Sequence, residues 1–261
     1  MNILLDVGAA GIFSKVMFAI QNLVKYNPQN AYVNCIDDNT TVIYKNPFDY
    51  VFVQPKVDGT YQRYFAQGMG SYTHRNRIED SSLFQSYKNQ AQKLIFTEDL
   101  NRLIHDHRNL VFHNTIGVHI RLTDMNVLHK IYGVYNIDHY LHLSESLLLK
   151  TDANLFVASD NNESLYRFKS EFGERVGYVP NMLRCEYDNG NSTQLQYDHI
   201  HRKRFWLEAF LEMRLLSRCN TIVCRTSNLP NVAKIFSKKK QNYIWLPQLP
   251  TWDWKEKRRP R

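Results

Sequence analysis

The sequence predicts an α/β protein with parallel sheets, and three observations support this fold class. Short apolar runs alternate with longer amphipathic stretches along most of the 261 residues, a pattern typical of strands joined by helices. The chain opens with a strand, a glycine-containing turn, a helix and a second strand, which is the start of a parallel βαβ unit. The apolar run 115–120 then ends abruptly in polar residues, as a buried strand does at the ligand-binding edge of an open sheet.

The first half of the chain combines this βαβ unit with a less regular stretch. We expect strands at 1–7 and 31–36, and helices at 12–25, 81–87 and 97–107. The glycines after the first strand lack GxGxxG spacing, so their predicted role is to let the backbone turn. Residues 46–74 have no clear period. Their aromatic side chains fit either a groove for a sugar or the core of a loop-rich subdomain: Tyr61, Tyr64, Phe65 and Tyr72.

The second half alternates more regularly and predicts a doubly wound, nucleotide-binding sheet. We expect strands at 115–120, 154–158, 175–179, 221–224 and 243–246, and helices at 137–149, 163–172, 202–216 and 230–236. The predicted organisation is an N-terminal lobe at 1–111, a C-terminal lobe at 112–250 and a basic tail at 251–261.

Composition fits a globular protein that binds an anionic small molecule. The hydrophobic fraction is 43% and the charged fraction 22%, with a net charge of +8. Residues 255–261 hold five basic residues and one acidic residue, so half of the excess lies in the tail. This tail fits either a solvated terminus or a contact with acidic lipid or nucleic acid. No nucleic-acid-binding motif occurs elsewhere, so nucleic acid is not an expected partner.

The cysteines and the absence of a leader predict a cytoplasmic location. The four cysteines form no CxxC pair, so we expect reduced core thiols: Cys35, Cys185, Cys219 and Cys224. No apolar run is long enough to cross a membrane, and the N-terminus lacks the basic region of a signal peptide. No metal site is expected, because the sequence has no DxD element, and its two His-x-His pairs, at 105–107 and 199–201, have no matching ligands.

Three polar segments follow predicted strands, and they should meet at one edge of the sheet. The first contains His119, Arg121 and Asp124; the arginine can bind a diphosphate through two donors, and the aspartate can accept a proton. The second contains Asp160. The third opens a helix, where hydroxyl and backbone N–H groups can bind phosphate oxygens: Thr226, Ser227 and Asn228.

Two helical carboxylates complete the candidate set, and each candidate has a structural alternative. Glu208 and Glu212 lie four residues apart and project from one helix face; like Asp160, they could bind the donor-rich edge of guanine. They could equally form a solvated face with neighbouring arginines. Arg121 could pair with a carboxylate, Asp160 could cap a helix, and Ser227 and Asn228 could form a cap.

The three segments resemble the motifs of a known family. His119-Ile-Arg-Leu-Thr-Asp124 resembles the first motif of the GDP-fucose-dependent fucosyltransferases of the α1,6, α1,2 and protein-O-fucosyl groups. Ala158-Ser-Asp160 resembles their second motif, and 208–220 followed by 223–228 resembles their third. The matches lie in the C-terminal half in the family's order. Three positions depart from the family's pattern. Leu122 stands where a basic residue is usual, and Arg225 where a smaller residue is usual. Glu212 stands where the family has aspartate.

The resemblance implies a GT-B fold, with two Rossmann-like lobes and parallel sheets, and an inverting, metal-independent glycosyltransferase. The donor would be GDP-fucose, the acceptor a glycan hydroxyl, and no cofactor would be needed. It implies that Arg121 holds the β-phosphate, that His119 and Glu212 contact guanosine, and that Ser227 and Asn228 hold phosphate oxygens. Asp124 is the candidate general base. One alternative is transfer from another nucleotide sugar, and a second is a non-catalytic sugar-binding or scaffold role on the same fold. The oligomeric state is left open.

Overall fold

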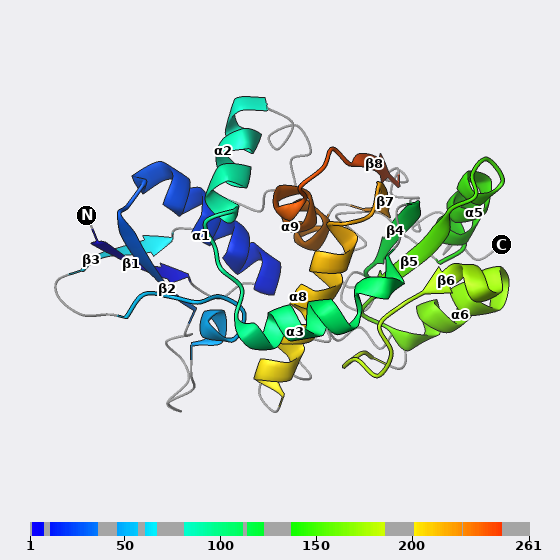
Figure 1. Cartoon of the computed structure of the whole chain (residues 1–261), viewed down its shortest axis with the longest axis horizontal. Helices are drawn as coiled ribbons and strands as arrows, with labels where there is room; N and C mark the ends of the chain where they lie inside the picture. Colours follow the sequence, from blue (N-terminus) through cyan, green and yellow to red (C-terminus); the bar gives the residue numbers. More distant parts are fainter. Residues whose placement is uncertain are drawn as a thin grey trace, which may run out of the picture. The chain divides into compact units, whose positions relative to one another are not determined.

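The chain forms two compact units, each built around its own parallel sheet (Figure 1). The computed structural model describes residues 2–7, 11–35, 46–56, 61–66, 81–111, 114–122, 137–185, 201–225 and 227–246. The first unit comprises Met1–Arg108, His201–Ser217 and Thr226–Lys238. The second comprises Asn109–Ile200, Arg218–Arg225 and Lys239–Arg261. Two segments of the C-terminal half therefore pack in the first unit. The lobe boundaries expected from the sequence stay a prediction.

The sheet of the first unit has three strands in the order β2-β1-β3. β1 (Asn2–Val7) pairs in parallel with β2 (Asn30–Asn34) and with β3 (Gln62–Ala66), and α1 (Ile12–Tyr26) connects β1 to β2. The central strand carries the apolar side chains, and its Ile3 and Leu5 are fully buried. β3 lies in the stretch where the sequence predicted no regular element. Its edge position explains this, since a strand that starts Gln-Arg-Tyr carries no apolar run.

Helices and aromatic rings form the rest of the first unit. They are η1 (Pro47–Tyr50), α2 (Ser81–Ala91), α3 (Glu98–Asp106), α8 (Arg202–Leu216) and α9 (Asn228–Phe236). Phe52 contacts both Phe96 and Phe210, with ring centroids 5.5 and 5.3 Å apart. Phe236 of α9 stacks on Phe96 at 5.5 Å. This aromatic cluster therefore holds α8 and α9 against segments from the start of the chain.

The sheet of the second unit has five strands in the order β6-β5-β4-β7-β8, and every pairing is parallel. The strands are β4 (Thr115–Ile120), β5 (Asn154–Ser159), β6 (Val176–Gly177), β7 (Thr221–Cys224) and β8 (Asn242–Trp245). The strands that follow β4 first add to one side of it, as β5 and β6, and then to the other, as β7 and β8. The order therefore reverses between β4 and β7, which is the topological switch point where open α/β sheets bind ligands.

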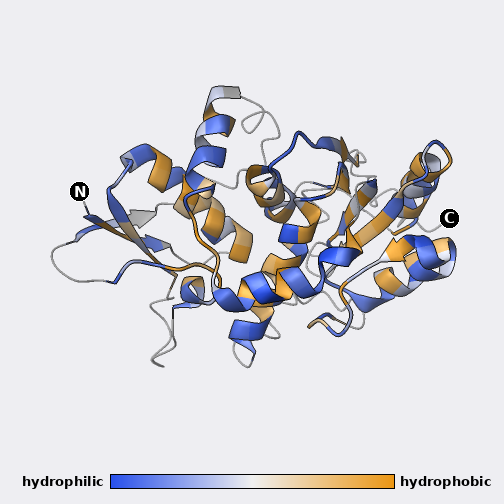
Figure 2. Cartoon of the chain, viewed as in Figure 1, coloured by the Kyte–Doolittle hydropathy of each residue, from blue (hydrophilic) through white to orange (hydrophobic). Residues whose placement is uncertain are grey.

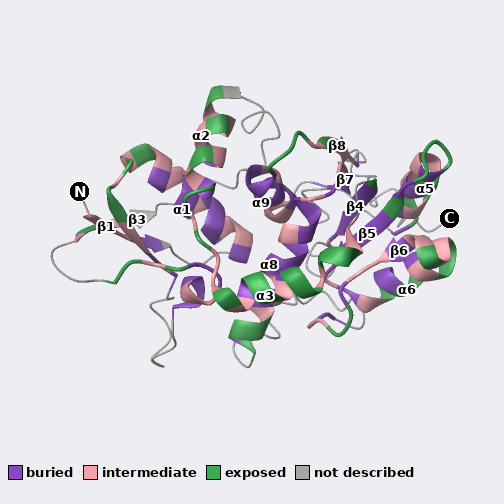
Figure 3. Ribbon diagram, in the orientation of Figure 1, coloured by how far each residue is buried: buried purple, intermediate pink, exposed green. Residues whose placement is uncertain are grey.

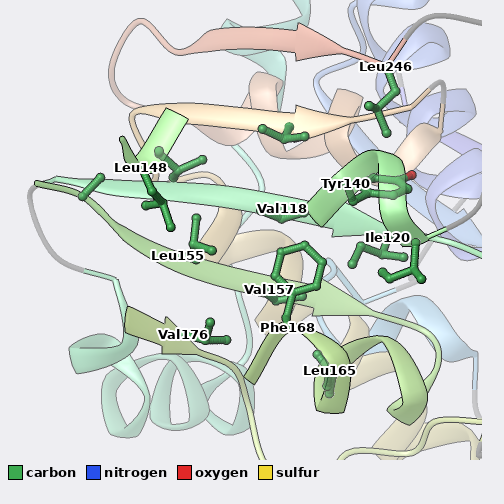
Figure 4. Packing of buried hydrophobic residues seen from close by; sticks show 14 residues of the cluster. Val118, Ile120, Tyr140, Leu148, Leu155, Val157, Leu165, Phe168, Val176 and Leu246 are labelled. Carbon is green, nitrogen blue, oxygen red and sulfur yellow. The ribbon is translucent and has the colours of Figure 1, made fainter. Parts of the chain in front are cut away.

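Two helices cover one face of this sheet, α5 (Ile137–Leu148) and α6 (Asn162–Phe172). Figure 4 shows their side chains meeting those of the strands: Tyr140 from α5, Phe168 from α6, and Val118 and Val157 from β4 and β5. The central strands are largely hydrophobic (Figure 2) and buried (Figure 3). Short helical turns, η3 (Arg108–Leu110) and η4 (Gly173–Arg175), precede β4 and β6.

The structure confirms the α/β class with parallel sheets, and most predicted elements agree with it to within a few residues. The third strand of the second sheet is shorter than predicted, since only Val176–Gly177 pairs with β5. All four cysteines lie in the described part of the chain; each is buried, and none forms a disulfide. Within the described residues, no helix combines the length and apolarity that a membrane crossing requires.

The packing of α6 gives a first testable expectation. Phe168 is 0% exposed in the core, whereas Tyr166 on the same helix is 63% exposed. Phe168→Ala should lower the free energy of unfolding by about 3–5 kcal/mol, because it removes buried area and leaves a cavity. Tyr166→Ala should change it by less than about 0.5 kcal/mol. Urea unfolding of both variants measures the difference, and equal effects would contradict the packing described for α6.

Candidate functional site

The first predicted segment lies at the carboxyl end of the central strand of the second unit. All six residues of β4 are buried, including His119, which is only 4% exposed. Arg121 and Leu122 follow directly after the strand and are half-buried. An apolar strand thus delivers one imidazole and one guanidinium to the edge of the sheet at the switch point.

His119 is electrically neutral in this position. Burial, together with the smaller effect of the positive charges of Arg121 and Arg225, lowers its pKa from 6.5 to about 3. Its Nδ1 is buried and has no hydrogen-bond partner among the residues that the structure describes. The ring can therefore offer a donor or an acceptor to a ligand without adding to the positive charge of the site.

A second arginine lies at the end of the neighbouring strand. β4 and β7 pair in parallel with His119 opposite Cys224, so Arg225 follows directly beyond this pair. Arg225 is 3% exposed. The positive charges of Arg225 and of Arg121 both act on His119.

Asp160 fixes the backbone that carries Arg121. It follows β5, and its Oδ1 accepts a hydrogen bond from the backbone N–H of Leu122 at 3.2 Å. The cap of α6 is instead Asn161, whose Oδ1 accepts from the N–H of Ser164 at 2.8 Å. The alternative in which Asp160 caps the helix is therefore wrong. The structure places His119, Arg121 and Asp160 at the same edge of one sheet, with Asp160 bonded to the residue after Arg121.

Arg184 is a structural residue at this edge that no sequence pattern predicts. It is 4% exposed, and its guanidinium donates to the carbonyls of Ser159 at 2.9 Å and Val179 at 3.0 Å. The backbone N–H of Cys185 also donates to the carbonyl of Asp160 at 3.0 Å. These bonds hold the segment after β6 against the end of β5. An isolated arginine in a polar stretch has no pattern that would predict them.

The helical carboxylates belong to the first unit, on α8, and their surroundings differ. Glu208 accepts a 2.6 Å ion pair from Arg204, one turn earlier on the helix. This ion pair agrees with the structural alternative for Glu208, in which it pairs with a neighbouring arginine on the helix surface. Glu212 is 5% exposed and lies on the buried side of α8. An open pocket of about 380 Å³ adjoins Glu208 between α3 and α8, lined also by Leu103 and Lys203.

The start of α9, also in the first unit, carries Ser227 and Asn228. Ser227 occupies the N-cap position, but its side chain makes no capping hydrogen bond. Its Oγ is buried and has no partner within the described residues. Asn228 donates from Nδ2 to the Oγ of Ser14 at 2.7 Å. The simple capping role considered for Ser227 is therefore not the one its hydroxyl performs here.

Several predicted residues lie outside the described part of the chain. These are the candidate base Asp124, the phosphate candidate Thr226, the aromatic Tyr72 and the tail 251–261. Of the other aromatic residues of 46–74, Tyr64 stacks on Tyr26 with centroids 4.2 Å apart, and the Tyr61 hydroxyl donates to the carbonyl of Lys56 at 3.0 Å. Among the described residues, no group of three or more His, Cys, Asp or Glu side chains could hold a metal ion.

Comparison with solved structures gives fucosyltransferases as neighbours. The fucosyltransferase NodZ from Bradyrhizobium superposes with a TM-score of 0.55 at 12% identity, over 90% of this chain and 93% of that chain. The NodZ α-1,6-fucosyltransferase soaked with GDP-fucose gives a TM-score of 0.54 at 14% identity, over 90% and 93%. Another NodZ structure was co-crystallised with GDP and gives 0.53 at 14% identity, over 90% and 92%. No protein-family model and no curated protein sequence matches the chain.

These likenesses establish the fold. The chain has the GT-B-like architecture of the NodZ structures, which confirms the fold that the sequence predicted.

The neutral His119 gives an expected pH dependence. Its pKa is about 3 in the folded protein against an ordinary 6.5, so between these values only the unfolded chain takes up the proton. Stability is therefore lost as the pH falls below 6.5, by about 2 kcal/mol at pH 5 for this group. Between pH 7 and pH 5, the free energy of unfolding should decrease in both proteins. The decrease should be about 2 kcal/mol smaller for His119→Gln, which lacks the titrating imidazole. Parallel urea titrations at both pH values measure it, and identical decreases would contradict a neutral His119.

Proposed function

We propose that the chain is an inverting, metal-independent glycosyltransferase that transfers fucose from GDP-fucose to a hydroxyl of a glycan acceptor. The observation that carries the proposal is the position of Arg121 and the buried, neutral His119 at the switch point between β4 and β7. The GT-B-like fold, with NodZ structures soaked with GDP-fucose or co-crystallised with GDP among its neighbours, supports the donor class.

The chemistry follows from the charge that develops on the leaving group. In a direct displacement, the acceptor oxygen attacks the anomeric carbon while the bond to the β-phosphate oxygen breaks, through an oxocarbenium-like transition state. Negative charge grows on the diphosphate, and a guanidinium fixed beside it stabilises that charge. Arg121 has this role in the proposal. Asp160 acts as a positioning residue, because its bond to the Leu122 N–H fixes the backbone next to Arg121.

The remaining candidates have roles in donor binding and proton transfer. His119 contacts the donor as a neutral group, and Ser227 contributes the buried hydroxyl that caps no helix. Glu212, which stands where the resembled family has aspartate, is assigned to guanine. Glu208 accepts the ion pair of Arg204. Thr226 and Asn228 complete the phosphate contacts. Asp124 accepts the proton of the acceptor hydroxyl.

Calorimetry with nucleotides tests the donor class. We expect GDP and GDP-fucose to bind with EDTA present and UDP and ADP to bind at least tenfold more weakly. Selective binding of UDP or ADP instead would indicate a transferase using another nucleotide sugar, and binding that requires added Mg²⁺ would contradict metal independence. Absence of any nucleotide binding would overturn the proposal in favour of a non-catalytic protein on this fold.

Arg121→Ala tests the mechanism. Transfer of fucose from GDP-fucose should fall by about a hundredfold or more, because the developing charge on the diphosphate loses its cation. The matched control is Arg167→Ala in the same unit, which removes an exposed ion pair with Asp138 and should leave the rate unchanged. The assay is release of GDP in the presence of a glycan mixture, with circular dichroism confirming that both variants fold. Near-normal turnover by Arg121→Ala would show that the proposed mechanism is wrong.

A further inference from the structure

The positive charge of the chain is concentrated in residues 213–261. This segment holds 12 Lys and Arg against two Asp and Glu, whereas residues 1–212 hold 21 against 23. The net charge of +8 therefore comes entirely from 213–261, and no acidic residue occurs between Glu212 and Asp253. Solubility is served as well by cations interspersed with anions, so a segregation of this size indicates an extended anionic partner.

Folding places some of these cations in the interior and others at the surface. Arg225 is 3% exposed, and Arg214 is half-buried, with its guanidinium donating to the carbonyl of Phe236 at 3.0 Å. By contrast, the three consecutive lysines at 238–240 are all exposed. They lie between the end of α9 and the start of β8, and we call them the lysine turn. The excess charge is thus presented to solvent at this turn.

Arg218 lies at the same edge of the second sheet as the lysine turn. The turn leads into β8, and Arg218, which is half-buried, leads in the same way into β7. Side chains join the two segments, because Gln241 Nε2 donates to the carbonyl of Cys219 at 2.8 Å and Lys239 Nζ donates to Asn220 Oδ1. Asn220 is neutral, so this bond orients the ammonium without cancelling its charge.

This edge is opposite to the one that carries the candidate site. β4, β7 and β8 run in parallel; the lysine turn precedes β8, whereas Arg121 follows β4. The four residues of β7 span roughly 13 Å, so the length of the strands separates the two edges. A partner bound to the lysine turn therefore leaves the carboxyl edge of the sheet uncovered.

A lipid surface fits the basic segment better than a nucleic acid does. Three of the four tryptophans of the chain also lie in 213–261, at positions 245, 252 and 254, and Trp beside basic residues is typical of membrane interfaces. The exposed cations of the turn are lysines, whose compact charge suits a layer of headgroups. Fixed contacts to a nucleic-acid backbone favour the arginine fork instead, and the sequence has no nucleic-acid-binding motif.

We propose that the lysine turn, together with Arg218, binds the surface of a membrane that contains anionic lipids. The chain is then held at the membrane by the amino edge of its second sheet. Each lysine near such a surface strengthens binding about fivefold. Salt weakens the interaction, because it screens exposed charges. The inference goes beyond the proposed function and does not depend on it, since binding to vesicles requires no nucleotide.

Cosedimentation of the full chain with lipid vesicles tests this inference. At low ionic strength, the chain should bind vesicles of phosphatidylserine and phosphatidylcholine in equal parts, and bind phosphatidylcholine alone at least tenfold more weakly. A variant that combines Lys238→Gln, Lys239→Gln and Lys240→Gln should bind the mixed vesicles about a hundredfold more weakly, because three attractive charges are lost. Replacement of the same three residues by arginine keeps the charge, so its binding should stay within threefold.

The matched control removes three exposed lysines of the first unit, Lys25→Gln, Lys56→Gln and Lys93→Gln. It lowers the net charge by the same amount and should leave vesicle binding within threefold. Circular dichroism and melting curves confirm that all variants fold.

Three outcomes would overturn the inference. The first is no binding of the unsubstituted chain to the mixed vesicles. The second is a loss of less than tenfold in the glutamine variant of the lysine turn, or an equal loss in the control, which would show that net charge alone attracts the chain. The third is a tenfold loss of affinity for duplex DNA in the turn variant while its vesicle binding is unchanged, which would assign the turn to nucleic acid.

Discussion

The parallel pairing of β4 with both β5 and β7 is the constraint on which the candidate site depends. Main-chain hydrogen bonds fix Ile120 opposite Ser159 and His119 opposite Cys224, so three strands from distant parts of the chain end at the same level. Since strands of a parallel sheet run in one direction, the polar residues that follow them gather at one edge. A slip of one residue in either pairing would turn the buried side chains of β4 to the opposite face. The apolar core on α5 and α6 therefore also fixes the register of the site.

Packing separates α8 and α9 from the strands next to them in sequence. The chain leaves the second unit after Ile200, returns for β7, leaves again for α9 and returns for β8. The rings of Phe52, Phe210 and Phe236 explain this path, because they bury α8 and α9 in the first unit against a segment near residue 50. Contacts between rings so far apart in sequence are invisible to local periodicity. For this reason the sequence predicted both helices correctly and assigned them to a lobe by chain order alone.

Sequence patterns predicted the buried elements better than the site. β4, α8 and β7 have the bounds that periodicity predicted, since buried apolar side chains run through each of them. β3 was missed because an edge strand needs no apolar run. The bond from Leu122 to Asp160 spans 38 residues, so no local pattern could distinguish it from a helix cap. Asp124 and Thr226, which lie outside the described residues, stay predictions.

The electrostatics of the edge explain why a neutral histidine is placed beside two arginines. Burial of the imidazole makes its protonation unfavourable, and the charges of the two guanidiniums, which persist at physiological pH, add to this effect. The neutral imidazole therefore gives the edge a hydrogen-bonding group and no further positive charge. In the proposed function, a donor that binds at this edge would stabilise the folded state by mass action.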